Sequence, residues 1–308
     1  MDRISDILVI VNPLVREQPA IDKGVKLARW FGADIELLMC DTRTVQQAHT
    51  EGELPALSNA LLGNNLDALL EEFAQPLRDA GIGVTTHIIG GDSLHKAVVA
   101  WMRNSPADLV VKDTHHHSFA KRALAVNTDW HLIRTCRTPL LLTKPALWRS
   151  PPVLLAAVDP GHVNDKSGFL DHRILEAAAA VAKCSSAELH AMHAFFPAMI
   201  AASAEMPVIG ASAEILKTEL NRRIAQVRAL GDEFAILPRH LHVETAVAAE
   251  YIPRVAVECG ADIVVMGAIS RSSLATAVIG STAERVLEAL PCDVLVVKPR
   301  DFAQDLPF

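Results

Sequence analysis

A loop toward the C-terminal end of the chain combines glycines with hydroxyl side chains, the residue types that bind phosphate. Gly267 ends an apolar run, and Gly280 precedes an expected helix. Ser281 and Thr282 fall in the first turn of that helix, where free backbone N–H groups and two hydroxyls suit an anionic phosphate. The sequence Ser281-Thr-Ala-Glu284 also fits a capping box, which requires no ligand. The residues alone leave both a phosphate site and a packed loop open.

A second candidate site is a run of three histidines in the first half of the chain. His115, His116 and His117 follow another apolar run, and His131 lies one turn into the next expected helix, beside Asp129. Alternate residues of an extended loop point the same way. His115 and His117 can therefore converge and, with His131 or Asp129, form a three- or four-ligand zinc site. The alternative is a solvated loop whose histidines titrate near neutral pH and sense it.

Short apolar runs bounded by turn residues precede both candidate sites, and such runs are typical of buried parallel strands. In the first half the expected strands are residues 6–11, 34–40, 84–89, 107–112 and 139–143. In the second half they are residues 153–158, 187–193, 240–245, 261–266 and 292–297. Amphipathic helical patterns lie between them, and one such face consists of Leu170, Ile174, Ala178 and Val181. This alternation predicts an α/β fold with a doubly wound parallel sheet of about five strands in each half.

The chain also contains an internal repeat. Residues 108–112 resemble residues 262–266, and residues 136–145 resemble residues 290–299 at the same offset. The same order at the same spacing indicates two copies of one unit. A proline-containing stretch, Trp148-Arg-Ser-Pro-Pro152, breaks regular structure between the copies. The predicted domains are residues 1–148 and 151–308.

The segment Asp262–Pro299 resembles the C-terminal signature of the universal stress protein family. Its Gly-x2-Ser-x9-Gly-Ser spacing, followed by a strand reading Pro-Cys-x-Val-Leu-Val-Val-Lys-Pro, is similar to the Gly-x2-Gly-x9-Gly-Ser/Thr pattern of the nucleotide-binding members. The resemblance covers essentially the whole chain, including Thr128-Asp-Trp-His131 in the first half. It implies two tandem Rossmann-like domains that pair through their last strands as an internal pseudo-dimer, with further homo-oligomers left open.

For the second domain the resemblance implies a stress-responsive, non-catalytic regulator that binds ATP or a related nucleotide, with Mg²⁺ accompanying it. The implied contacts are Asp159 and Ala194 at the base, Met266 and Gly267 below the ribose, and Ser270, Gly280, Ser281 and Thr282 at the phosphates. Ser270 replaces the middle glycine of the signature. Neither a Walker lysine nor an acidic pair for Mg²⁺ is evident, so we expect any ATP hydrolysis to be slow.

The first half has lost the residues of the phosphate loop. The positions that match Gly267, Ser270, Gly280 and Ser281 hold Asp113, His116, Val126 and Asn127, and Asn12 stands where Asp159 would contact adenine. A negative charge at Asp113 disfavours phosphate, and both glycines have gained side chains. We therefore expect a degenerate nucleotide site in the first domain.

One apolar segment, residues 195–210, follows the second strand of the second half and contains two methionines and two prolines. Because Met adapts to irregular shapes, the segment could line a pocket for an apolar small molecule, or it could pack against the partner domain. Two alternatives to a non-catalytic nucleotide-binding protein therefore remain. The chain could be a binding module for an apolar metabolite in the second domain or for a metal in the first, or it could be a slow ATPase.

Composition limits the partners and the compartment. The chain has 308 residues, a formal net charge of −7, 50% apolar residues and 21% charged residues. Such an acidic chain is poorly suited to bind nucleic acid through bulk charge. The five cysteines form no CxxC pair and do not indicate a disulfide framework. With no basic leader and no apolar run of about 20 residues, we expect a cytoplasmic protein without a membrane span.

Overall fold

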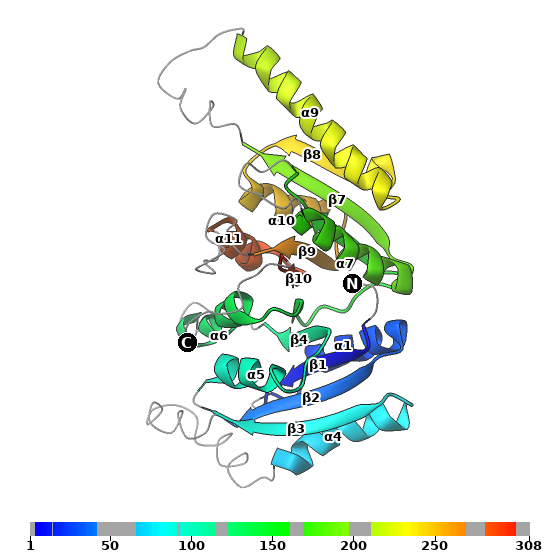
Figure 1. Ribbon diagram of the computed structural model, residues 1–308, viewed down its shortest axis with the longest axis vertical. Coiled ribbons are helices and arrows are strands. Elements are labelled where there is room, and N and C mark those ends of the chain that lie inside the picture. The colour runs from blue at the N-terminus through cyan, green and yellow to red at the C-terminus, as the bar shows by residue number, and fades with distance from the viewer. Residues whose placement is uncertain are drawn as a thin grey trace. The chain divides into compact units, whose positions relative to one another are not determined.

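The computed structural model consists of two compact units, residues 2–145 and residues 146–308, each with a sheet flanked by helices (Figure 1). The described residues are 4–13, 15–41, 66–91, 93–114, 122–160, 169–196, 211–268 and 281–299. None of the helices within them is both long enough and apolar enough to cross a bilayer.

The first unit is built on a five-stranded parallel sheet. Its elements are, in chain order, β1 (Asp6–Val11), α1 (Pro19–Phe31), β2 (Asp34–Asp41), α4 (Leu66–Asp79), β3 (Val84–Gly90), α5 (Leu94–Met102), β4 (Leu109–Asp113), α6 (Arg122–Thr135) and β5 (Leu140–Thr143). The strand order within this unit is β3-β2-β1-β4-β5, and all neighbours are parallel. The chain therefore winds first to one side of β1 and then to the other.

The second unit repeats this topology. Its elements are β6 (Val153–Ala157), α7 (Phe169–Ser185), β7 (Glu188–Phe195), α9 (Ala211–Glu233), the 3-10 turn η2 (Pro238–His240), β8 (Leu241–Thr245), α10 (Ala248–Glu258), β9 (Ile263–Gly267), α11 (Ser281–Ala289) and β10 (Asp293–Val297). The strand order is β10-β9-β6-β7-β8, again parallel throughout. The predicted fold, two doubly wound five-stranded parallel sheets, is confirmed.

Burial explains why the strands could be recognised. Leu8 and Val9 in β1, and Leu154 and Leu155 in β6, are fully buried, because helices cover both faces of each sheet. A strand buried on both faces reads as a continuous apolar run. The predicted apolar stripe of α7 also lies inside: Leu170, Ile174, Ala178 and Val181 are all at most 6% exposed.

An aspartate at the start of the fourth strand has the same structural role in both units. The Asp108 carboxylate accepts hydrogen bonds from the backbone N–H groups of Ser5, at 2.7 Å, and Asp6, at 3.2 Å. The Asp262 carboxylate likewise accepts from the backbone of Val153, at 2.8 Å, and Arg149, at 3.1 Å. Each aspartate thus ties the beginning of the first strand to the beginning of the fourth, which explains why the repeat retains it.

Candidate functional site

The carboxyl end of the second sheet brings together the predicted base and ribose residues. β6 lies between β9 and β7, with Ala157 opposite Met266 on one side and Met192 on the other. From β6 the chain continues to β7 and β8 on one side, and it then crosses to β9 on the other side of β6. The switch point of the sheet therefore lies between β6 and β9. In open α/β sheets this is where ligands bind. Asp159 follows β6 at this point, and Gly267 ends β9 beside it.

The loop after β6 is fixed through its backbone. The Asp159 N–H donates to the Asp171 carboxylate on α7 at 2.9 Å, and the Val158 N–H donates to the Met192 carbonyl at 3.0 Å. Asp171 is itself 4% exposed, whereas the Asp159 side chain is 44% exposed. The structure thus holds the backbone of Asp159 while its carboxylate remains partly exposed to solvent.

His193 belongs to this site, although the sequence analysis did not single it out. Its fully buried ring lies on β7, with Nδ1 3.1 Å from the Val158 carbonyl and 3.6 Å from the Asp159 carboxylate. A carbonyl can only accept, so Nδ1–H is the donor. Burial, the largest cause, lowers the pKa of His193, while the Val158 carbonyl and Asp159 oppose that shift. The neutral ring therefore supports the loop that carries Asp159.

We expect the buried ring of His193 to make the second unit sensitive to acid. Its pKa in the fold is lowered from the ordinary value of 6.5, so below about pH 6.5 the unfolded chain binds the proton more readily. The free energy of unfolding then falls as the pH falls toward the folded-state pKa, by at most about 1.4 kcal/mol per pH unit for this group. Urea unfolding of the wild type and of His193→Gln at about pH 7.5 and about pH 5.5 checks this.

Glutamine keeps an N–H donor for the Val158 carbonyl but does not titrate, so the variant should lose less stability over this interval than the wild type. An equal loss in both proteins would contradict the assignment. His240 and His242, whose pKa values burial also lowers, are present in both proteins and cancel in the comparison.

Gly267 lies close to the helix that covers β9. A Cβ atom at this position would lie 2.9 Å from Cδ2 of Leu170 on α7, closer than real contacts allow. The contact is with the end of a flexible side chain, so it favours a small residue at this position beside any ligand that β9 binds. Met266, just before it, is 4% exposed, and Ala194 on β7 is half-buried.

The predicted phosphate residues are described in part. α11 begins at Ser281, as expected, and Thr282 in its first turn is exposed. The helix is held by its apolar face, where Ala283 and Val286 are buried. Ser270 and Gly280 lie outside the described residues, as does the apolar segment from 197 to 210.

The first unit fills the corresponding sheet edge with a side chain. Asp113, which matches Gly267, is 3% exposed and accepts hydrogen bonds from the Ala20 N–H in the first turn of α1 and from the Thr143 hydroxyl, both at 2.7 Å. Burial, the largest cause, raises the pKa of Asp113 against these two hydrogen bonds and the charges of Lys112 and Lys23. The carboxylate thus caps α1 from inside the fold.

The helix after β4 also differs between the units. α6 begins at Arg122, so the positions that match Gly280 and Ser281, Val126 and Asn127, lie inside a helix. Backbone N–H groups in a helix interior are used by the helix itself and cannot bind an anion. The first unit therefore lacks, at these two positions, the helix N-terminus that the second unit presents at Ser281.

The predicted zinc ligands of the first unit are described only in part. His115 and His117 lie outside the described residues, whereas His131 on α6 stacks on His95 with ring centres 4.1 Å apart. Both oxygens of Asp129 are occupied: Oδ1 lies 2.6 Å from Lys112 Nζ, and Oδ2 accepts from the Thr114 hydroxyl at 2.9 Å. A role for Asp129 in metal binding would therefore break a nearly buried ion pair.

Comparison with known proteins decides the family. The model of the Universal stress protein family matches residues 4–144 and residues 165–298, which together make up most of the chain. The chain belongs to the universal stress protein family. Two family regions in one chain also confirm the tandem organisation of this universal stress protein.

Similar full-length relatives exist among curated proteins and solved structures. Universal stress protein E of Salmonella typhi and of Escherichia coli (strain K12) are each 25% identical over 307 residues, covering 98% of this chain and 96% of theirs. The solved structure of a putative universal stress protein from Pseudomonas aeruginosa UCBPP-PA14 is 29% identical with a TM-score of 0.75, covering 97% of this chain and 95% of that one. The likeness therefore extends over both domains.

Proposed function

We propose that the second domain of this universal stress protein, residues 151–308, binds ATP or a related adenine nucleotide, and that the chain acts as a non-catalytic stress regulator. The nucleotide would lie across the carboxyl ends of β6, β7 and β9. Its base would contact Asp159 and Ala194, its ribose would lie over Met266 and Gly267, and its phosphates, with Mg²⁺, would face Ser270, Gly280, Ser281 and Thr282.

The observation that carries this proposal is the contrast between the two switch points. In the second unit the partly exposed Asp159 carboxylate and the start of α11 at Ser281 belong to the same sheet edge. In the first unit, Asp113 caps α1 and the matching loop positions are helical. A degenerate site in the first domain, residues 1–148, is therefore part of the same proposal.

ATP is expected to raise the melting temperature of the second domain, because a ligand that binds the native state alone stabilises it. At about 100 times the dissociation constant the gain is about 2.7 kcal/mol, or about 5–10 °C for a domain of this size. The melting curve with and without millimolar Mg-ATP measures this shift.

The Gly280→Val variant serves as the control for this melting experiment. A side chain at Gly280 should prevent phosphate from approaching the backbone, so the variant should show no shift. If the wild type also shows none at millimolar Mg-ATP, the proposal fails. GTP at the same concentration tests whether the base is read through Asp159.

The cytoplasmic location and the internal pseudo-dimer are further parts of the proposal. None of the five cysteines forms a disulfide, and Cys40, Cys136 and Cys292 are buried, as suits a reducing compartment. Burial, and secondarily the charge of Asp41, raises the pKa of the Cys40 thiol to about 11, so it is unreactive at neutral pH. Two tandem family regions support the pairing of the domains as a pseudo-dimer.

A further inference from the structure

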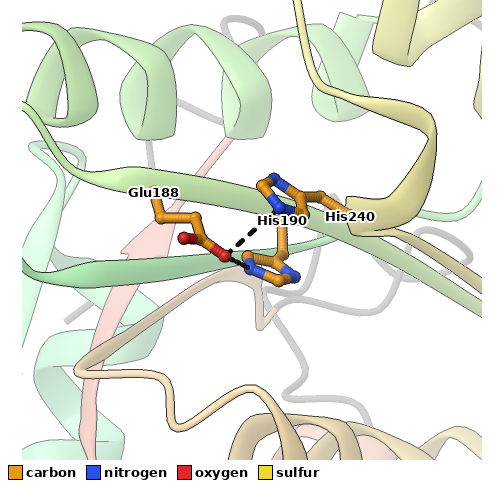
Figure 2. A group of neighbouring side chains, drawn as sticks. All are labelled: Glu188, His190 and His240. Carbon is orange, nitrogen blue, oxygen red and sulfur yellow. Dashed lines mark hydrogen bonds and ion pairs between the residues drawn. The ribbon is translucent and has the colours of Figure 1, made fainter.

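Three ionisable side chains meet at the amino ends of β7 and β8, away from the nucleotide edge of the second unit (Figure 2). Glu188 is the first residue of β7, and His190, two residues on, points to the same face of the strand. His240 ends the η2 turn just before β8, which pairs with β7. Figure 2 shows both imidazole rings directed at the Glu188 carboxylate.

The distances within this Glu188–His190–His240 cluster are those of potential metal ligands. Glu188 Oε1 lies 2.7 Å from His190 Nε2 and 3.2 Å from His240 Nε2, and the three ligand atoms all lie within 4.8 Å of one another. The two rings stack with centres 4.3 Å apart. The histidine side chains are 7% and 11% exposed, while Glu188 is 50% exposed.

We propose that Glu188, His190 and His240 bind a zinc ion or a similar divalent transition metal. Two imidazole nitrogens and one carboxylate oxygen form a ligand set that zinc accepts, at about 2.0–2.2 Å from each atom. Tetrahedral coordination at those lengths separates the ligand atoms by about 3.3 Å. The two separations from Glu188, 2.7 and 3.2 Å, lie below this value, so the side chains must move apart and the stacked rings must turn to admit the ion. The exposed side of Glu188 leaves the fourth position to water.

Each ring also has a hydrogen-bond partner other than Glu188. His190 Nδ1 lies 2.9 Å from His242 Nε2, and the His240 ring is hydrogen-bonded to the backbone carbonyl of Leu189. In each ring the nitrogen turned toward Glu188 is Nε2. A metal-binding histidine characteristically hydrogen-bonds through its other nitrogen, which fixes the ring. With zinc on Nε2 of His190, Nδ1–H would donate to His242.

Without a metal, hydrogen bonds hold the side chains of the cluster together. The Arg239 guanidinium Nε lies 3.1 Å from His240 Nε2, and the hydrogen bond with His190 is the largest cause that lowers the pKa of Glu188. Zinc would replace the hydrogen bond between His190 and Glu188 and displace the exposed Arg239 side chain.

The test counts zinc bound to the full chain after its affinity tag is removed, by equilibrium dialysis with elemental analysis. His190→Gln, His240→Gln and Glu188→Gln should each bind one zinc fewer than the wild type. His242→Gln should bind about 10–100-fold more weakly. Arg239→Gln should bind more tightly, because it removes a competing cation.

His172→Gln is the matched control for this zinc count. His172 lies in the same unit with Nε2 3.2 Å from the Glu233 carboxylate, but the described residues form no three-ligand group around it. Its zinc content should equal that of the wild type. The proposal is overturned if the His190, His240 and Glu188 variants bind as much zinc as the wild type. Because Glu188 is half-exposed, its variant should fold, and metal-free melting curves verify this.

Discussion

Asp129→Ala is expected to lower the free energy of unfolding of the first unit by about 3 kcal/mol, because it leaves a nearly buried ammonium without its counter-charge. The Lys112 and Asp129 side chains are only 11% and 13% exposed, with Nζ and Oδ1 2.6 Å apart. After the substitution Lys112 would retain the Asp113 carbonyl, at 2.7 Å, and the electrostatic attraction of the Asp113 carboxylate. Hydrogen exchange of the β1 and β4 backbone amides measures the loss, since core strands report the largest openings.

The Arg16–Glu72 pair of the same unit provides the control for Asp129. Its two charged groups are 2.9 Å apart, but the side chains are 81% and 60% exposed. Exposed pairs contribute roughly 0–1 kcal/mol, so Glu72→Ala should change exchange little. If Asp129→Ala were as mild as Glu72→Ala, Asp129 would be free to serve as a metal ligand beside His131.

Asp159→Ala is expected to weaken ATP binding by about 10–100-fold, since a hydrogen bond to a charged group contributes about 1.5–3 kcal/mol. The Asp159 N–H, which donates to Asp171, is unaffected by the substitution, so the loop after β6 should keep its position. The lost affinity should come from the contacts with the base, and the contribution of the phosphates should change little. Calorimetric titration with ATP and with inorganic tripolyphosphate separates the two contributions.

Asn12→Ala is the matched control for Asp159, because Asn12 follows β1 where Asp159 follows β6. Its substitution should leave the ATP affinity unchanged. Equal losses of ATP affinity in the Asp159 and Asn12 variants would show that neither residue is the specific contact of the base. A loss at Asn12 alone would assign the nucleotide to the first domain and contradict the proposal.

The sheet of each unit was predictable largely because its inner strands are buried on both faces. Runs such as Ile7–Val11 and Val294–Val297 stay apolar without alternation and are all at most 3% exposed. The repeat then required two copies of one topology, and Asp108 and Asp262 fulfil the same backbone role in both. These features are local in the sequence or repeated along it.

The details of the sites were less accessible, because they depend on contacts between distant residues. Gly267 lies against Leu170 on α7, and Asp113 accepts a hydrogen bond from Ala20 on α1. His190 and His240 are brought together by the pairing of β7 with β8. The spacing of Glu188 and His190, two apart on one strand, was the available signal for this cluster, and it gains meaning once His240 is placed beside it.

We propose that the chain has one nucleotide site, in the second domain. Calorimetric titration of the full chain with Mg-ATP counts the sites through its stoichiometry, without reference to any variant. We expect one ATP per chain. Two ATP per chain would show that the first domain also binds ATP, despite Asp113 and the early start of α6. No binding at millimolar Mg-ATP would show that the second domain has no nucleotide site.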